Sequence, residues 1–169
     1  MPYVRPANKI LVAGSPLVEE LVTEGATVKP GMPVIKGTGD HQIQPAGDGA
    51  KNPLGVADYD ARYSITDAYP DKSSVRVLKG SIVTVVTLAS GNNVSKGQAL
   101  VCAANGEVKA AADIAVNVPA GTTTVTSTAA QPDLQEIGSI PPYGVIVGYA
   151  EESVDASAEA KPLMMRMVI

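Results

Sequence analysis

The sequence predicts an all-β protein, a β-barrel or β-sandwich built from two related β units with short helical turns at most. Short apolar runs rich in Val, Ile and Thr, such as 82–88 and 144–148, alternate with turn residues along the chain, a pattern typical of strands. The 16 Gly and 13 Pro are spread over the 169 residues and are not pooled in one linker. A glycine-containing motif also occurs twice, which indicates an internal repeat.

The repeated motif reads Gly-x-x-Val-x-x-Gly-x-x-(Val/Leu)-(Ile/Val) and spans 25–35 and 91–101 with identical spacing. In each copy the central glycine, Gly31 or Gly97, fits a tight turn at a position that needs positive φ. Glycine takes this conformation without steric cost. Each copy is therefore expected to hold the end of one strand, a turn and the start of the next strand.

A second shared element, apolar-Gly-x-Ala-acidic, follows each copy, at 54–58 and at 147–151. A closing apolar segment then follows, 75–88 in the first half and 163–169 in the second. The separation is longer in the second half. Its extra residues, about 116–138, are rich in Thr, Ala and Pro and predict an inserted loop or hairpin.

These elements predict how the chain divides. Residues 1–23 are expected to form an N-terminal arm and the first strand, 24–90 the first β unit, and 91–169 the second, all within one compact domain. Two segments have helical alternatives. Residues 17–22 fit either a helix or a strand, and 132–138 fit one helical turn.

Composition and charge exclude several classes of protein. The chain has no Phe or Trp and six Tyr, so its core must consist of aliphatic residues and Met. The net charge is −4, and the 13 Lys and Arg are scattered, which argues against nucleic acid and against anionic membranes as partners. No apolar run approaches the length of a membrane span, and no secretion signal is recognisable. We expect a soluble protein that folds in a cytoplasm.

The residues that catalysis would need are missing or isolated. His41 is the only histidine, and no Gly-x-Ser-x-Gly motif accompanies it. Cys102 lies in an apolar run and is expected to be a small buried hydrophobe. The acidic pairs at 58–60 and 151–152 are expected to be solvated turn residues. The sequence predicts no enzyme, no cofactor and no metal site.

The turn and strand motifs at 24–34, 54–58, 94–101 and 144–152 resemble those of small β-barrel decoration or cement proteins of tailed, bacteriophage-like viruses. Two units in one chain, with an insertion in the second, depart from the simplest single-barrel pattern. The resemblance implies a structural protein that binds the outer surface of a viral capsid and stabilises it, without catalysis or cofactor. It also implies contact with the major capsid protein, a homo-oligomer with a trimer favoured, and a virion location after synthesis in the host cytoplasm.

Candidate contact residues lie in two places. The N-terminal stretch 2–9 is expected to be an arm that orders on docking, and Tyr3, Val4 and Arg5 are its candidate contacts. Tyr63 and Tyr69 are further candidates because tyrosine is a frequent anchor of interfaces. For each tyrosine, a role in the core or on a strand face is the alternative.

Two other functions remain open. Biotinyl or lipoyl carrier domains of the hammerhead type show similar Val-x-x-Gly repeats, but they need a modifiable lysine at a hairpin tip. Lys51 and Lys109 are the nearest candidates, and neither has the full signature. Another β-barrel binding module is the second alternative. A β-sandwich hydrolase is disfavoured because catalytic residues are lacking.

Overall fold

The computed structural model describes residues 8–111 and 145–169, and this part of the chain is all-β. It holds thirteen strands and one 3-10 turn, Ala104–Gly106, which confirms the predicted fold class. The segment 17–22 is a strand. The predicted insertion at 116–138 and the possible helical turn at 132–138 lie outside the described residues. The strands are β1 (Leu11–Ala13), β2 (Leu17–Thr23), β3 (Pro33–Lys36), β4 (Gln42–Pro45), β5 (Gly55–Ala57), β6 (Ser74–Lys79), β7 (Val83–Leu88), β8 (Asn92–Val94), β9 (Ala99–Cys102), β10 (Val108–Ala110), β11 (Ile146–Ala150), β12 (Val154–Ala156) and β13 (Lys161–Met167).

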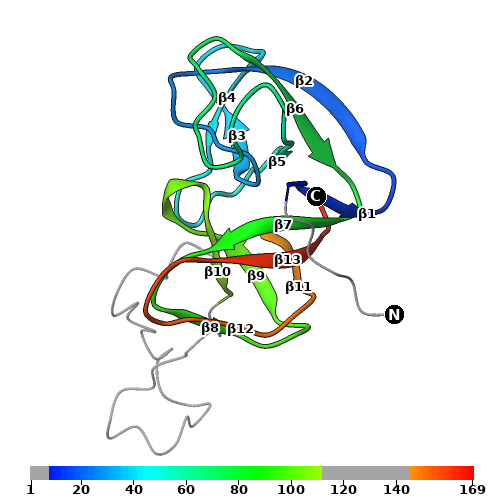
Figure 1. Ribbon diagram of the computed structural model, residues 1–169, viewed down its shortest axis with the longest axis vertical. Helices are drawn as coiled ribbons and strands as arrows, with labels where there is room; N and C mark the ends of the chain where they lie inside the picture. Colours follow the sequence, from blue (N-terminus) through cyan, green and yellow to red (C-terminus); the bar gives the residue numbers. More distant parts are fainter. Residues whose placement is uncertain (1–7, 112–144) are drawn as a thin grey trace, which may run out of the picture.

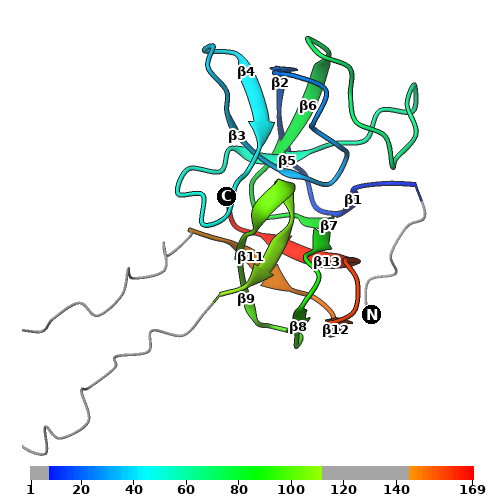
Figure 2. The same cartoon turned by 90° about the vertical axis from the view of Figure 1, so that its left-hand side faces the viewer.

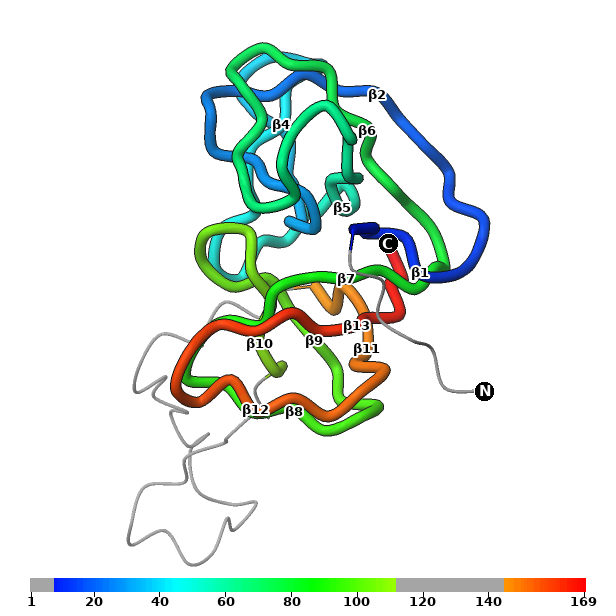
Figure 3. Tube along the Cα trace, in the orientation of Figure 1, coloured from blue at the N-terminus to red at the C-terminus, as the bar shows by residue number. Residues whose placement is uncertain are grey.

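The strands form two barrels, one above the other in Figures 1 and 2. The first is closed in the order β2-β4-β3-β5-β6. The second has the order β7-β10-β9-β11-β13 and closes through pairing of β13 with β7. Strand β1 adds to the outer side of β7, and β8 pairs with β12 as a separate ribbon. The trace in Figure 3 therefore starts at the second barrel, builds the first, and returns.

The two barrels have the same strand order and directions, so the predicted repeat of two related β units is confirmed. β2 corresponds to β7, β3 to β9, β4 to β10, β5 to β11 and β6 to β13. In both barrels the first and third of these strands pair in parallel, β2 with β4 and β7 with β10, and all other pairs are antiparallel. The closing segment 75–88 holds strands of both barrels, because β6 completes the first and β7 begins the second. The predicted unit limits at 24 and 91 follow the glycine motif and stay a prediction.

The turn glycines join the two motifs of each repeat. Gly31 and Gly97 have φ of 82° and 88°, as the predicted turn requires. The N–H of Gly31 donates to the carbonyl of Ala57 at 2.8 Å, and that of Gly97 donates to Ala150 at 2.7 Å. The turn motif and the apolar-Gly-x-Ala motif are therefore hydrogen-bonded partners in both barrels, although the sequence distance between them differs.

Each barrel has its own buried core, and the core of the second barrel extends to residues of the first. One buried cluster consists mainly of residues of the second barrel, including Leu88, Leu100 and Met165, and it also includes Val56 and Leu78 of the first. A second, separate cluster takes residues from all five strands of the first barrel and is its core. All of these side chains except Tyr69 are aliphatic, Met or Cys, as the composition predicts.

Candidate functional site

The groups considered for catalysis lie apart from one another. His41 is exposed in the turn before β4. Cys102 is fully buried in β9, and burial raises the pKa of its thiol to about 11, so it is protonated and unreactive near neutral pH. Within 8–111 and 145–169, no group of three or more His, Cys, Asp or Glu side chains is arranged to hold a metal ion. No helix in this part of the chain is long and apolar enough to cross a membrane.

The two carrier lysines do not lie at hairpin tips. Lys109 lies within β10, opposite Val101 of β9, and its Nζ is 2.6 Å from Oδ1 of Asp48. Lys51 is exposed in the connection between β4 and β5. These two strands pair with β3 and not with each other. Neither lysine therefore has the geometry of a carrier site.

The acidic residue that ends each apolar-Gly-x-Ala-acidic motif is ion-paired, and the expectation of a solvated turn acid is wrong for both. Nη2 of Arg76 lies 3.4 Å from Oδ2 of Asp58, whose side chain is 15% exposed. In the second barrel, Nη2 of Arg166 lies 2.5 Å from Oε1 of Glu151, whose side chain is 7% exposed. The next strand of each barrel supplies the arginine, so the acid is held against the sheet.

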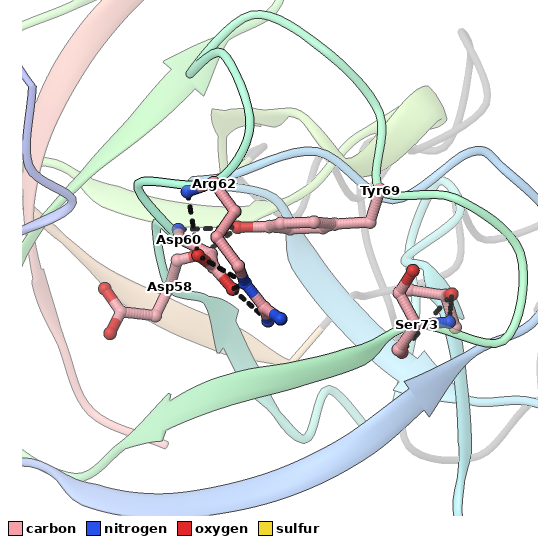
Figure 4. A network of polar contacts seen from close by, with 6 residues as sticks. Asp58, Asp60, Arg62, Tyr69 and Ser73 are labelled. Carbon is pink, nitrogen blue, oxygen red and sulfur yellow. Dashed lines mark hydrogen bonds and ion pairs between the residues drawn. The ribbon is translucent and has the colours of Figure 1, made fainter.

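Tyr69 is the centre of a polar network in the connection between β5 and β6 (Figure 4). Its hydroxyl donates to the carbonyl of Asp58 and accepts from the N–H of Asp60 at 3.2 Å. Burial raises the pKa of Tyr69 to about 12. Asp60 is bound by Arg62, with Oδ2 and Nη2 2.5 Å apart, and hydrogen bonds from Arg62 lower the pKa of Asp60. The network fixes the loop that follows β5.

The structure separates the two candidate tyrosines. Tyr69 is 1% exposed, so it has the core role that the sequence left open, and it is not available to a partner. Tyr63 is partly buried and packs edge-on against the Tyr69 ring, with ring centroids 5.5 Å apart. It stays a predicted contact. Tyr3, Val4 and Arg5 lie outside the described residues.

Exposed apolar side chains mark surfaces that the sequence reasoning did not single out. Their exposed fractions reach 74% for Leu17, and the set comprises Leu17, Val18, Val145, Ile146, Tyr149 and Val168. Leu17 and Val18 begin β2, and Glu20 of the same strand lines a hollow of about 400 Å³ together with Asp58, Asp60, Arg76 and other residues. The available signal was the run Leu17–Val22, in which two apolar residues precede two glutamates. Sequence alone left open whether this run was a helix or a strand.

Two β-barrels that pack against each other, with ion-paired acids and exposed apolar side chains, define an all-β module whose surface is its candidate site. The comparisons with known proteins agree with this class. A family model described as "Structural cement protein (E217 gp24/Pam3 gp6)" matches residues 11–139. Because this match covers more than half of the chain, the chain belongs to the phage structural cement protein family. It is therefore a structural, capsid-stabilising protein of the virion, as the resemblance implied.

A solved structure shows the same fold. The structure described as "head fiber gp8.5 N base in bacteriophage phi29" is similar over 90% of this chain and 94% of that chain, with a TM-score of 0.50 and 11% identity. At this identity the similarity concerns the fold alone. The search of curated proteins finds no significant match.

Proposed function

We propose that the protein binds the outer surface of the capsid, contacts the major capsid protein there, and stabilises the shell without catalysing any reaction. The observation that carries the proposal is the set of large apolar side chains left exposed on the surface of two barrels whose cores are already filled. Exposed apolar patches mark interaction sites. A ligand that binds only the assembled shell stabilises it by mass action.

The charge favours the outer surface over the inner one. The inside of a filled capsid faces the phosphates of the genome, where proteins usually carry basic patches. This chain has a net charge of −4 and scattered Lys and Arg. Contact with nucleic acid or with a membrane is therefore not part of the proposed function.

The finer assignments follow the resemblance to decoration proteins. The protein is made in the host cytoplasm and assembles on the capsid as a homo-oligomer, with a trimer favoured. Tyr3, Val4 and Arg5 of the N-terminal arm and Tyr63 of the first barrel contribute contacts. Sedimentation velocity in solution tests the trimer: the particle should have the mass of three 17.3 kDa chains.

The decisive experiment is co-sedimentation with empty capsids of the same virus. The full chain should pellet with capsids in a saturable manner and should raise their melting temperature. A chain that lacks residues 1–9 should bind more weakly if the arm contributes. Failure of the full chain to bind would contradict the proposed function, whereas unchanged binding of the shortened chain would contradict only the arm. Turnover of generic ester or glycoside substrates would contradict the absence of catalysis.

A further inference from the structure

The first half of β2 has an unpaired edge. β2 pairs with β6 from Leu17 to Val22, but with β4 only at Val22 and Thr23. The N–H of Val22 donates to His41 and that of Thr23 to Ser73 of the β6 side, so backbone groups of even-numbered residues point away from β6. The backbone N–H and C=O groups of Val18 and Glu20 therefore face outward. No backbone group in the described part of the chain forms a hydrogen bond with them. In Figures 1 and 3 this half of β2 curves along the side of the molecule next to β6.

The equivalent edge of the second barrel is paired with an added strand. β7 takes the place of β2, with Val86 and Leu88 facing inward as Leu21 and Thr23 do. The parallel pairing gives the same alignment, because the N–H of Glu24 donates to the carbonyl of Ile43 and the N–H of Ala89 donates to that of Val108. Val83 and Val85 therefore correspond to Val18 and Glu20.

On that edge of β7 lies β1, a strand from outside the barrel. It runs antiparallel, with Ala13 opposite Val83, and the N–H of Val85 donates to the carbonyl of Ile10 at 2.8 Å. Val83, which β1 flanks, is 4% exposed, whereas Val18 is 46% exposed. The same position is thus covered by an added strand in one barrel and open in the other.

The open edge carries exposed apolar residues as well as charges, which is unusual on a free protein. Natural sheets protect their edges with charges, prolines, bulges or covering segments, because an open edge pairs readily with another chain. Here Leu17 and Val18 are exposed at the edge. Addition of a strand there would satisfy the outward backbone groups of Val18 and Glu20 and cover Val18.

The charges beside the edge indicate which strand fits. A cross-strand row runs from Asp58 to Arg76, which are ion-paired, and on to Glu20, which lies opposite Arg76 in β2. Glu20 has no ion-pair partner in the described part of the chain, whereas its neighbour Glu19 binds Lys79. The row alternates negative, positive, negative, so a basic residue on the next strand would continue it.

The same charges disfavour a second copy as the occupant. Pairing of two β2 edges would bring Glu19 and Glu20 of both copies together, and like charges on adjacent strands are destabilising. The hollow of about 400 Å³ beside Glu20 has room for a long basic side chain.

We propose that the β2 edge at Val18–Glu20 is a strand-addition site for an extended segment of the major capsid protein. The segment lies antiparallel to β2, as β1 lies on β7, and presents a Lys or Arg to Glu20 and an apolar residue to Val18. This inference rests on the proposed function and names the site through which the capsid is bound.

Two edge variants test the site. Val18→Pro removes an outward N–H and leaves the β6 ladder intact, because proline is tolerated where the N–H faces away from the sheet. Glu20→Lys reverses the charge that the partner meets. Ala158→Pro and Glu159→Lys, in the exposed connection between β12 and β13, are the matched controls. Thermal melting verifies that each variant is folded.

The measurement is equilibrium binding to empty capsids of the same virus. The edge variants should bind at least about tenfold more weakly than the natural chain, and the controls should bind within about twofold of it. Hydrogen exchange of the Val18 and Glu20 amides should be slower in the capsid-bound protein than in the free protein. If Val18→Pro does not fold, the hydrogen-exchange measurement and the Glu20→Lys variant still test whether the β2 edge is the binding site.

Three outcomes would overturn the inference. If the natural chain binds capsids and the edge variants bind equally well, the β2 edge is not the site, and the proposed function stands. If the edge amides are already protected in the free protein and Val18→Pro changes its sedimentation coefficient, the edge belongs to a contact between copies. If the natural chain does not bind capsids at all, the proposed function and this inference fail together.

Discussion

Replacing Gly148 by alanine should destabilise the second barrel strongly. Gly148 lies in β11 between β9 and β13. An added Cβ would lie 2.5 Å from Cγ of Met165 and closer still to the carbonyl oxygen of Arg166. Non-bonded carbon atoms are at their optimal separation at about 3.5–4.0 Å. Met165 is fully buried and cannot swing away, so β13 itself must move.

The expected cost follows from the nature of the obstacle. Overpacking of a core typically costs about 1–3 kcal/mol. The oxygen of Arg166 belongs to the backbone, so relief of the clash must also disturb the β11–β13 ladder. We therefore expect a loss of about 3 kcal/mol in the free energy of unfolding. For a chain of this size, that loss corresponds to a drop of roughly 6–12 °C in the melting temperature.

Gly47→Ala is the matched control. A Cβ at Gly47 would meet no atom within 4 Å, and Gly47 is exposed. The free energy of unfolding should therefore change by less than about 0.5 kcal/mol. Urea unfolding followed by far-UV circular dichroism measures both variants, with the slope on urea concentration verifying that the unfolded surface is unchanged. Equal stabilities of the two variants would refute the steric reasoning for Gly148.

Further predictions use the same assay. The hydroxyl of Thr84 is buried without a hydrogen-bond partner in the described chain, so Thr84→Val should raise the free energy of unfolding by about 1–2 kcal/mol. Thr23→Val should lower it by a similar amount, because that hydroxyl donates to the carbonyl of Pro70 at 2.7 Å; a loss in both variants would contradict the assignment for Thr84. Tyr69→Phe leaves two backbone groups unpaired and should cost about 1–2 kcal/mol, whereas Tyr59→Phe should be neutral. The pKa of Tyr69 is raised to about 12, so its contribution to stability should be complete below about pH 10 and be lost as the pH rises through about 12; urea midpoints measured along this range should fall less steeply for Tyr69→Phe. Cys102 should react with a thiol reagent at pH 8 only as fast as the protein unfolds, and labelling at the rate of a free thiol would show that it is not buried.

The repeat was predictable because it is local. The spacing between Gly25, Val28 and Gly31 encodes a turn followed by a strand, and its recurrence at 91–101 encodes a second one. Glycine at the positive-φ position leaves a signature in the sequence because other residues are strained there. The fold class and the equivalence of the two units therefore followed from short stretches of sequence.

The pairing of distant strands was not predictable from the sequence. The run 75–88 reads as one apolar segment, but Gly80, with φ of 100°, separates β6 of the first barrel from β7 of the second. Likewise, nothing in Leu11–Ala13 indicates that it lies on β7, some seventy residues further along the chain. Such contacts depend on closure of the whole barrel, which periodicity in a short window does not report.

Individual side chains of the candidate site were equally hard to assign. Tyrosine is common both in cores and at interfaces, and only the barrel interior decides that Tyr69 is in the core. The acids Asp58 and Glu151 were expected to be solvated turn residues. The arginines that pair with them come from strands that are adjacent only in the folded sheet.

The two barrels differ in what covers their equivalent edges, and this difference connects the fold to its function. If β1 had a counterpart on β2, the equivalent edges of both barrels would be closed. Because β1 covers β7 alone, the first barrel keeps an edge at which a partner's backbone can add without any change in the core. A strand added there would join the partner to a barrel whose Val56 and Leu78 pack in the core of the second one. Force on the partner would then be spread over both barrels, which is what a protein that reinforces a shell requires.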